Sequence, residues 1–114
     1  MESIRNLTPK EECLLGLLVK KSSMSFPNNW KENLLVQTMK DAGMVSLVLF
    51  PESIVEEKRR FGKCISEFQF IDQDGVVVIA SLNIDDKGKL FELDMWKTDY
   101  SPLINIPDNI CEIE

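Results

Sequence analysis

The sequence contains no histidine among its 114 residues. This absence excludes a Ser-His-Asp triad, a Cys-His nucleophile pair and the common zinc sites in which histidine is a ligand. Proton transfer near neutral pH would require a Glu, Asp, Lys, Tyr or Cys side chain with a shifted pKa. The composition therefore favours a protein that is not an enzyme.

Cysteine is also scarce, with three residues that lie far apart in the sequence. No two of them form a CxxC pair, so neither a zinc ribbon nor a thioredoxin-type site is expected. A fully oxidised framework would leave one thiol unpaired. We therefore expect Cys13, Cys64 and Cys111 to be reduced and mostly buried in a cytoplasmic protein.

Long apolar runs are missing, and the longest are far shorter than the ~20 residues of a membrane-spanning helix. The first residues lack a basic region followed by an apolar stretch, so no secretory signal is expected. The five glycines are scattered and form no phosphate-binding loop. With 44% hydrophobic and 28% charged residues, the chain has the composition of one globular domain over residues 1–114. We expect the protein to bind neither a cofactor nor a membrane.

The charge is unevenly distributed along the chain. Residues 1–63 carry 10 basic and 8 acidic side chains, a net charge of +2, whereas residues 64–114 carry 3 basic and 11 acidic ones, a net charge of −8. The acidic half should repel nucleic acid and attract basic proteins. A basic cluster at 58–60 stands beside glutamates in an acidic chain, so nucleic-acid binding is not expected.

The N-terminal region predicts one helix over residues 9–20. Thr8 can cap it, Pro9 suits its first position, and Glu11 completes a capping box. Leucines at 14, 17 and 18 follow at helical spacing, and two lysines at 20 and 21 suit the negative end of the helix dipole.

The remainder predicts a mostly antiparallel sheet. Two strands are expected around the turn at 41–43, although a helix over 30–40 is an alternative. Three strands of a meander follow, over 64–71, 76–83 and 90–96. The fold class is therefore α+β, with an N-terminal helix packed on a sheet of four to five strands.

Alternation within the meander assigns side chains to faces. Cys64, Phe68 and Phe70 should share one face of the first strand. The second strand is nearly all apolar and should be covered on both faces. In the third strand, Phe91 should point inward with two neighbouring apolar residues, and Glu92, Asp94 and Trp96 should share the opposite face.

Two acidic patterns resemble parts of known sites, one a calcium loop and the other a pair of catalytic carboxylates, but each lacks a required feature. Asp72 and Asp74 begin like a calcium loop, but Val76, Val77 and Asn83 stand where further ligands are required, so a hairpin turn without metal is the better interpretation. Glu92 and Asp94 could form an acid–base pair. Such a pair also needs a cleft that shifts one pKa, which the sequence does not indicate.

Three stretches resemble a family of small bacterial proteins of unassigned activity. They are residues 7–12 (LTPKEE), 39–47 (MKDAGMVSL) and 91–103 (FELDMWKTDYSPL), of which the last is the most distinctive. The resemblance implies a compact bacterial domain and transfers no catalytic residue. In size and acidity the chain is also similar in general character to immunity proteins of bacterial toxin systems.

These observations lead to a hypothesis of a non-enzymatic inhibitor that binds and neutralises a cognate basic toxin domain, most plausibly a nuclease. Acidic groups would mimic phosphates, and an aromatic side chain would anchor the complex. The candidate partner-binding residues are Asp72, Asp74, Asp85, Asp86, Glu92, Asp94, Trp96 and Tyr100. The alternative is a small regulatory or ligand-binding domain that dimerises through an uncovered sheet face. A carboxylate enzyme centred on Glu92 and Asp94 is the third class.

Overall fold

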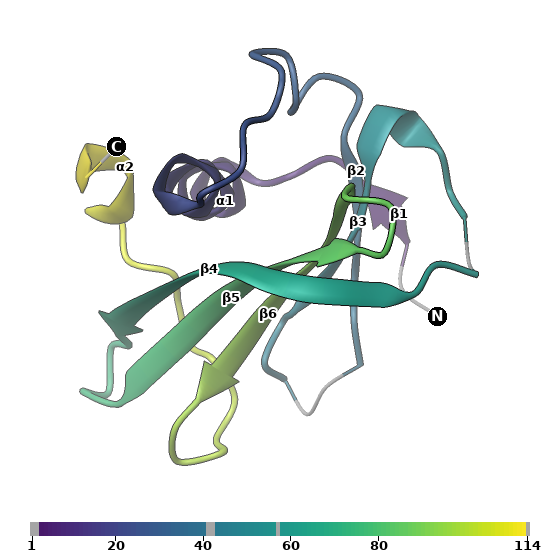
Figure 1. Ribbon diagram of the computed structural model, residues 1–114. Coiled ribbons are helices and arrows are strands. Elements are labelled where there is room, and N and C mark those ends of the chain that lie inside the picture. The colour runs from purple at the N-terminus through teal and green to yellow at the C-terminus, as the bar shows by residue number, and fades with distance from the viewer. Residues whose placement is uncertain (1–2, 41–42, 57, 114) are drawn as a thin grey trace.

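The computed structural model describes residues 3–40, 43–56 and 58–113. It is an α+β fold in which one six-stranded antiparallel sheet carries two helices on the same face (Figure 1). The strand order is β1-β2-β3-β6-β5-β4. The strands are β1 (Ile4–Arg5), β2 (Leu35–Thr38), β3 (Leu47–Phe50), β4 (Phe61–Ile71), β5 (Val77–Asp85) and β6 (Leu90–Lys97). The sequence predicted four to five strands, because the two-residue strand β1 is too short to show a period.

Helix α1 (Pro9–Lys21) confirms the predicted helix and its cap. The Thr8 hydroxyl accepts a hydrogen bond from the Glu11 amide at 3.2 Å, and the Glu11 carboxylate accepts one from the Thr8 amide at 2.9 Å. Its leucines at 14, 15, 17 and 18 are buried against the sheet. Burying each such side chain contributes roughly 1.5–3 kcal/mol, so this face anchors the helix.

The ambiguity over residues 30–40 is resolved in favour of a strand. Residues 28–33 form turns, and β2 then pairs with β3 in antiparallel register, with Val36 opposite Leu49. Both of these side chains are fully buried. Of the predicted turn between the two strands, Asp41 and Ala42 lie outside the described residues. Gly43 adopts a φ of +83°, a conformation that glycine accommodates readily.

The meander of β4, β5 and β6 confirms the two predicted hairpin turns. The Gly75 amide donates to the Asp72 carbonyl at 2.9 Å, and the Gly88 amide donates to the Asp85 carbonyl at 3.1 Å. Both glycines have φ near +80°, which explains their place in these turns.

Two face assignments in the meander are wrong. Register shifts in β4, between Phe61 and Lys63 and between Cys64 and Ser66, move Cys64 to the face opposite Phe68. A further shift, between Asn83 and Ile84, makes Leu90 rather than Phe91 the buried residue at the start of β6. Alternation along one strand cannot reveal a bulge. The extra residue becomes visible only when the strand is aligned with the strand that pairs with it.

The expectation that the second meander strand is covered on both faces is also wrong. In β5, alternate residues from Val78 to Ile84 are buried beneath the helices, whereas Val77, Ile79 and Ser81 are only half-buried. The helices cover one face of the sheet. No helix of the described residues lies over the other face, which we call the open face (Figure 1).

The prediction of three reduced, mostly buried cysteines is wrong. Cys13 of α1 and Cys111 of the short helix α2 (Ile110–Ile113) form a disulfide, with Cα atoms 5.0 Å apart. Cys64 is free and exposed. The partners lie 98 residues apart, and they meet only because the C-terminal segment packs along α1. Lys10 strengthens this contact through Asn105 at 2.7 Å and Asp108 at 3.0 Å.

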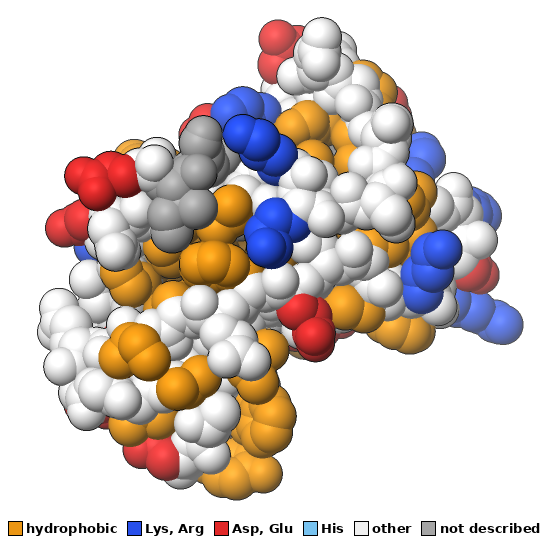
Figure 2. Space-filling view, turned by 60° about the vertical axis from the view of Figure 1, so that its left-hand side comes forward, with side chains coloured by type: hydrophobic (Ala, Val, Ile, Leu, Met, Phe, Trp, Pro, Cys, Tyr) orange, Lys and Arg blue, Asp and Glu red, His pale blue; other side chains and the backbone are white. Residues whose placement is uncertain are grey.

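Several apolar side chains remain at the surface. Figure 2 shows hydrophobic groups in separate patches between acidic and basic side chains. Four large apolar side chains at or near the open face are between 45% and 74% exposed. They are Phe61, Ile71, Trp96 and Tyr100. No helix in the described ranges is long and apolar enough to cross a membrane.

Candidate functional site

The eight predicted partner-binding residues fall into three groups. Glu92, Asp94, Trp96 and Tyr100 lie on β6 and the turn that follows it. The other four lie at the two hairpins that begin and end β5, with Asp72 and Asp74 at the first and Asp85 and Asp86 at the second. Only the first group lies together on the open face, and we call it the acid–aromatic face.

The register of three strands builds the acid–aromatic face. Ser81 of β5 stands between Glu67 of β4 and Asp94 of β6, and Asn83 stands opposite Glu92. The Ser81 hydroxyl donates to Glu67 at 3.3 Å, and the Asn83 amide donates to Asp94 at 2.6 Å. Directly opposed side chains in antiparallel strands share a face, so these contacts fix the orientation of the acidic groups.

The aromatic end of this face is built by a tight turn. The Tyr100 amide donates to the Lys97 carbonyl at 2.9 Å, and Tyr100 adopts a φ of +65°. Asp99 holds the turn by accepting hydrogen bonds from the amide and the hydroxyl of Ser101. As a result, the rings of Trp96 and Tyr100 lie with centroids 5.9 Å apart. They are 45% and 74% exposed, so both rings are open to a partner.

The two carboxyl groups on β6 influence each other. Burial, together with the neighbouring carboxylate of Asp94, raises the pKa of Glu92 above its ordinary value of 4.5, and Arg59 opposes this shift. Two acids that share a site resist simultaneous ionisation, which agrees with the direction of the Glu92 shift.

Asp72 lies in the interior rather than at a binding surface. Its carboxylate accepts hydrogen bonds from the amides of Ile104 and Asn105, at 2.8 and 3.1 Å, and pairs with Lys97 at 2.9 Å. Burial alone would raise the pKa of Asp72, but these amides and the ammonium group hold it below the ordinary value. Asp74 completes the cluster, since it also pairs with Lys97, at 2.6 Å. These contacts attach the C-terminal segment to the hairpin.

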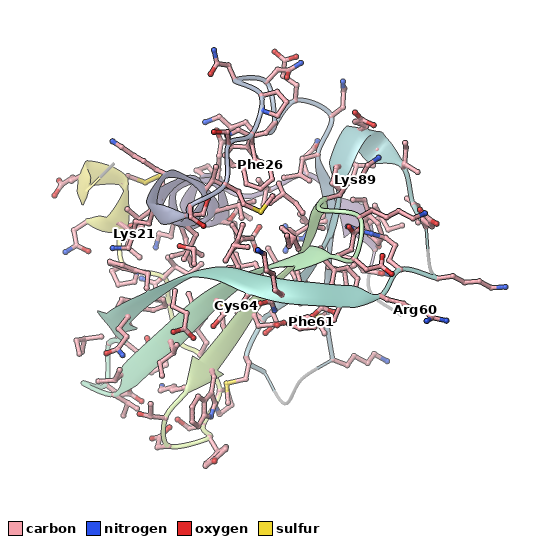
Figure 3. All side chains as sticks on the ribbon, viewed as in Figure 1. Lys21, Phe26, Arg60, Phe61, Cys64 and Lys89 are labelled. Atoms are coloured by element: carbon pink, nitrogen blue, oxygen red, sulfur yellow. A yellow bond between two sulfur atoms is a disulfide. The ribbon has the colours of Figure 1, made fainter. Side chains whose placement is uncertain are left out.

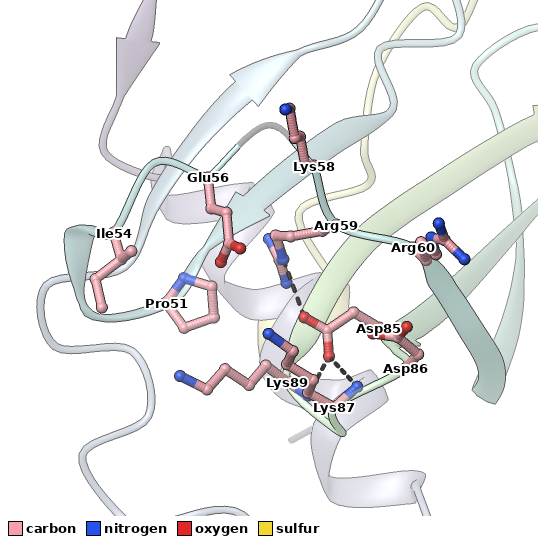
Figure 4. Close-up of a pocket in the computed structure, with 10 residues that line it drawn as sticks. All are labelled: Pro51, Ile54, Glu56, Lys58, Arg59, Arg60, Asp85, Asp86, Lys87 and Lys89. Carbon is pink, nitrogen blue, oxygen red and sulfur yellow. Dashed lines mark hydrogen bonds and ion pairs between the residues drawn. The ribbon is translucent and has the colours of Figure 1, made fainter.

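Asp85 is likewise committed to internal contacts. Its carboxylate accepts hydrogen bonds from the amides of Lys87 and Lys89, both at 2.9 Å, and from Arg59 at 3.0 Å (Figure 4). The Arg59 guanidinium also donates to the carbonyls of Leu49 and Leu90. Burial would raise the pKa of Asp85, yet these donors lower it overall. Of the four hairpin acids, Asp74 and Asp86 are exposed.

Sequence patterns alone do not identify three residues that border the acid–aromatic face, Glu67, Ser81 and Asn83. Alternation along β4 places Glu67 on the face opposite Phe68, but nothing in the sequence indicates which residues of β5 and β6 it contacts. Such contacts depend on strand order and register, which a bulge alters by one residue. Within the described ranges, no group of three Cys, Asp or Glu side chains is arranged to hold a metal ion.

Comparison with known proteins identifies a family. A family model described as a domain of unknown function, DUF6984, matches residues 4–107 of the chain. No curated protein and no solved structure matches it. The match agrees with the expectation of a small domain family without an assigned activity, and it assigns no function to any residue.

Proposed function

The chain belongs to the DUF6984 family, and we propose that it is an immunity-type inhibitor that binds and neutralises a basic toxin domain, most plausibly a nuclease. The acid–aromatic face is the binding surface, and Glu92, Asp94, Trp96 and Tyr100 are its principal contacts. The observation that carries the proposal is the position of two acids beside two exposed aromatic rings on a sheet face that no helix covers.

The chemistry of this face suits a basic partner. Exposed tryptophan and tyrosine rings supply large apolar contacts at low entropic cost and are frequent anchors of protein interfaces. The neighbouring carboxylates would meet Lys or Arg side chains that otherwise bind phosphate groups. The net charge of −6 would speed the encounter with such a partner.

The burial of Asp72 and Asp85 removes these two residues from the candidate partner-binding residues. Both carboxylates already have cationic and amide partners and are only 3% and 4% exposed. Breaking those contacts to bind a toxin would leave buried charges unpaired. The inhibitor therefore does not use them, and Asp74 and Asp86 contribute only to the surrounding negative potential.

Co-expression with toxins encoded by neighbouring genes tests the proposal. The wild-type chain should protect cells from one of them and should bind the purified toxin domain. The double variant Glu92→Gln/Asp94→Asn should weaken binding by about tenfold or more, because charged interface contacts are worth roughly 1.5–3 kcal/mol. Trp96→Ala should have a comparable effect, since anchors of this kind contribute about 2 kcal/mol or more.

A matched control removes two acids elsewhere. Glu12 and Glu112 are exposed on α1 and α2, on the helix-covered side of the sheet. The variant Glu12→Gln/Glu112→Gln changes the net charge by the same amount and should retain tight binding. If both double variants bound equally well, the acid–aromatic face would not be the interface. If no neighbouring toxin were neutralised or bound, the inhibitor function itself would be rejected.

A further inference from the structure

Basic residues from two distant parts of the chain line one pocket of about 160 Å3 (Figure 4). Lys58 and Arg60 lie in the segment before β4, on one side of the pocket, and Lys87 and Lys89 extend from the β5–β6 hairpin on the other. We call these four residues and the space between them the cationic pocket. The sequence separates the two pairs by more than twenty residues, so the cluster at 58–60 looked isolated.

The cationic pocket carries an excess of positive charge. Arg59 also lines it, but its charge is balanced by Asp85, and its side chain is only 7% exposed. Of the remaining charged residues in the lining, four are basic and two are acidic, Glu56 and Asp86. A local excess of this sign is unexpected in a chain of net charge −6. This positive charge raises the concentration of anions near the pocket.

A groove of about 330 Å3 adjoins the cationic pocket, and its lining combines apolar residues with polar ones, Glu32 and Glu52 among them. Half-buried Phe26 and Trp30 line it, together with Leu90 of β6. Pro51 and Lys89 line both spaces, so the two lie side by side. Figure 3 shows Phe26 and Lys89 on the facing segments. The groove has the size at which small-molecule sites begin, roughly 300 Å3.

The walls of this groove are held in unusual backbone conformations. Asn33 and Glu52 line it with φ values of +59° and +60°, and Ser53 has a φ of +61°. The Ser53 hydroxyl donates to the Asn33 carbonyl at 2.6 Å and joins the two walls. Left-handed conformations of residues other than glycine are uncommon and cluster at ligand sites, so they agree with a preformed groove.

We propose that the cationic pocket and the adjoining groove bind a small phosphorylated aromatic molecule of the nucleotide type. The phosphate group would lie among Lys58, Arg60, Lys87 and Lys89, and the aromatic ring would lie against Phe26 and Trp30. This site shares no residue with the acid–aromatic face. The proposal of a ligand site is therefore independent of the proposed inhibitor function.

Adenosine monophosphate is the probe for this proposal, with adenosine and inorganic phosphate as its two parts. Calorimetric titration should show saturable binding of the monophosphate at millimolar or lower concentration, and each part should bind at least about tenfold more weakly. The indole N–H resonance of Trp30 should shift during the titration, whereas that of Trp96 should not. The variant Trp96→Phe assigns the two signals.

The variant Lys87→Gln/Lys89→Gln should weaken binding by about tenfold or more, because contacts to charged groups contribute roughly 1.5–3 kcal/mol. Both side chains are exposed, and the backbone amides that hold Asp85 are retained, so the fold should persist. Lys40→Gln, at an exposed lysine between β2 and β3, is the control and should bind as the wild type does.

Three results would overturn the proposal. The first is the absence of saturable binding or of a Trp30 shift with the monophosphate. The second is adenosine binding as tightly as the monophosphate, which would remove the role of the cationic pocket. The third is inorganic phosphate binding as tightly, which would remove the role of the groove.

Discussion

The ammonium group of Lys97 lies 2.9 Å from the carboxylate of Asp72, and both side chains are almost completely buried, at 1% and 0% exposure. Lys97 ends β6, and Asp72 follows β4, so the pair joins the two outer strands of the meander. Through Asp72 it also attaches the C-terminal segment at Ile104 and Asn105. The stability of the fold should therefore depend on this ion pair.

Replacing Lys97 by methionine should lower the free energy of unfolding by about 3–5 kcal/mol, because Asp72 is left as an uncompensated buried charge. Denaturant titration measures this loss. Lys31→Met is the matched control, since Lys31 pairs with Glu12 at 3.2 Å but both side chains are 47% exposed. Its effect should stay below about 1 kcal/mol. Equal effects of the two variants would show that the buried pair is not a principal contact.

The protein should lose stability in acid. The pKa values of Glu11, Asp72 and Asp85 are all lowered in the folded state, from ordinary values of 4.5, 3.8 and 3.8. The unfolded chain therefore binds protons first. The stabilisation is complete above these ordinary values and is lost as pH falls through the lower, folded pKa values. Unfolding measured between neutral pH and about pH 2 should show this decline.

A variant identifies the contribution of Asp72 to this decline. Asp72→Asn removes the group that titrates, so its unfolding free energy should depend less steeply on pH below about 4, although it is less stable at neutral pH. The exposed acid Asp86, replaced by Asn, is the control and should leave the slope unchanged. A wild-type slope in Asp72→Asn would contradict the assignment.

Reduction of the disulfide should destabilise the fold. Cys13 and Cys111 close a loop of almost the whole chain, and removal of a native disulfide typically costs about 2–5 kcal/mol. Cys13→Ser/Cys111→Ser should reproduce the effect of reductant, and reductant should then have no further effect on that variant. Cys64→Ser should change stability by less than about 0.5 kcal/mol, because Cys64 is free and exposed. Unfolding with and without reductant distinguishes these outcomes.

The coupling between Glu92 and Asp94 predicts a directional pKa change. Asp94→Asn removes a neighbouring negative charge that raises the pKa of Glu92, so that pKa should fall toward, but remain above, its ordinary value, because burial still raises it. Carboxyl NMR titration measures the shift. Asp86→Asn, on the β5–β6 hairpin, should leave the Glu92 titration unchanged. An unaltered Glu92 pKa in Asp94→Asn would show that the two acids titrate independently.

Local patterns in the sequence were sufficient for the features that depend on nearby residues. The capping box of α1 joins Thr8 and Glu11, three residues apart, and the hairpin turns depend on Gly75 and Gly88 within a few residues of their partners. The face shared by Glu92, Asp94 and Trp96 also follows from alternation along one strand. These features can be predicted without knowing the strand order.

Only the tertiary structure decided the contacts between distant segments. Asp72 and Asp85 looked like surface acids, but Lys97 and Arg59 neutralise them in the interior, and Cys13 meets Cys111 across 98 residues. The bulges of β4 and β6 moved Cys64 and Phe91 from their expected faces. Charge composition and alternation describe what a residue can do locally. Its partner, and hence its availability for binding, is determined by how the strands pair and where the C-terminal segment packs.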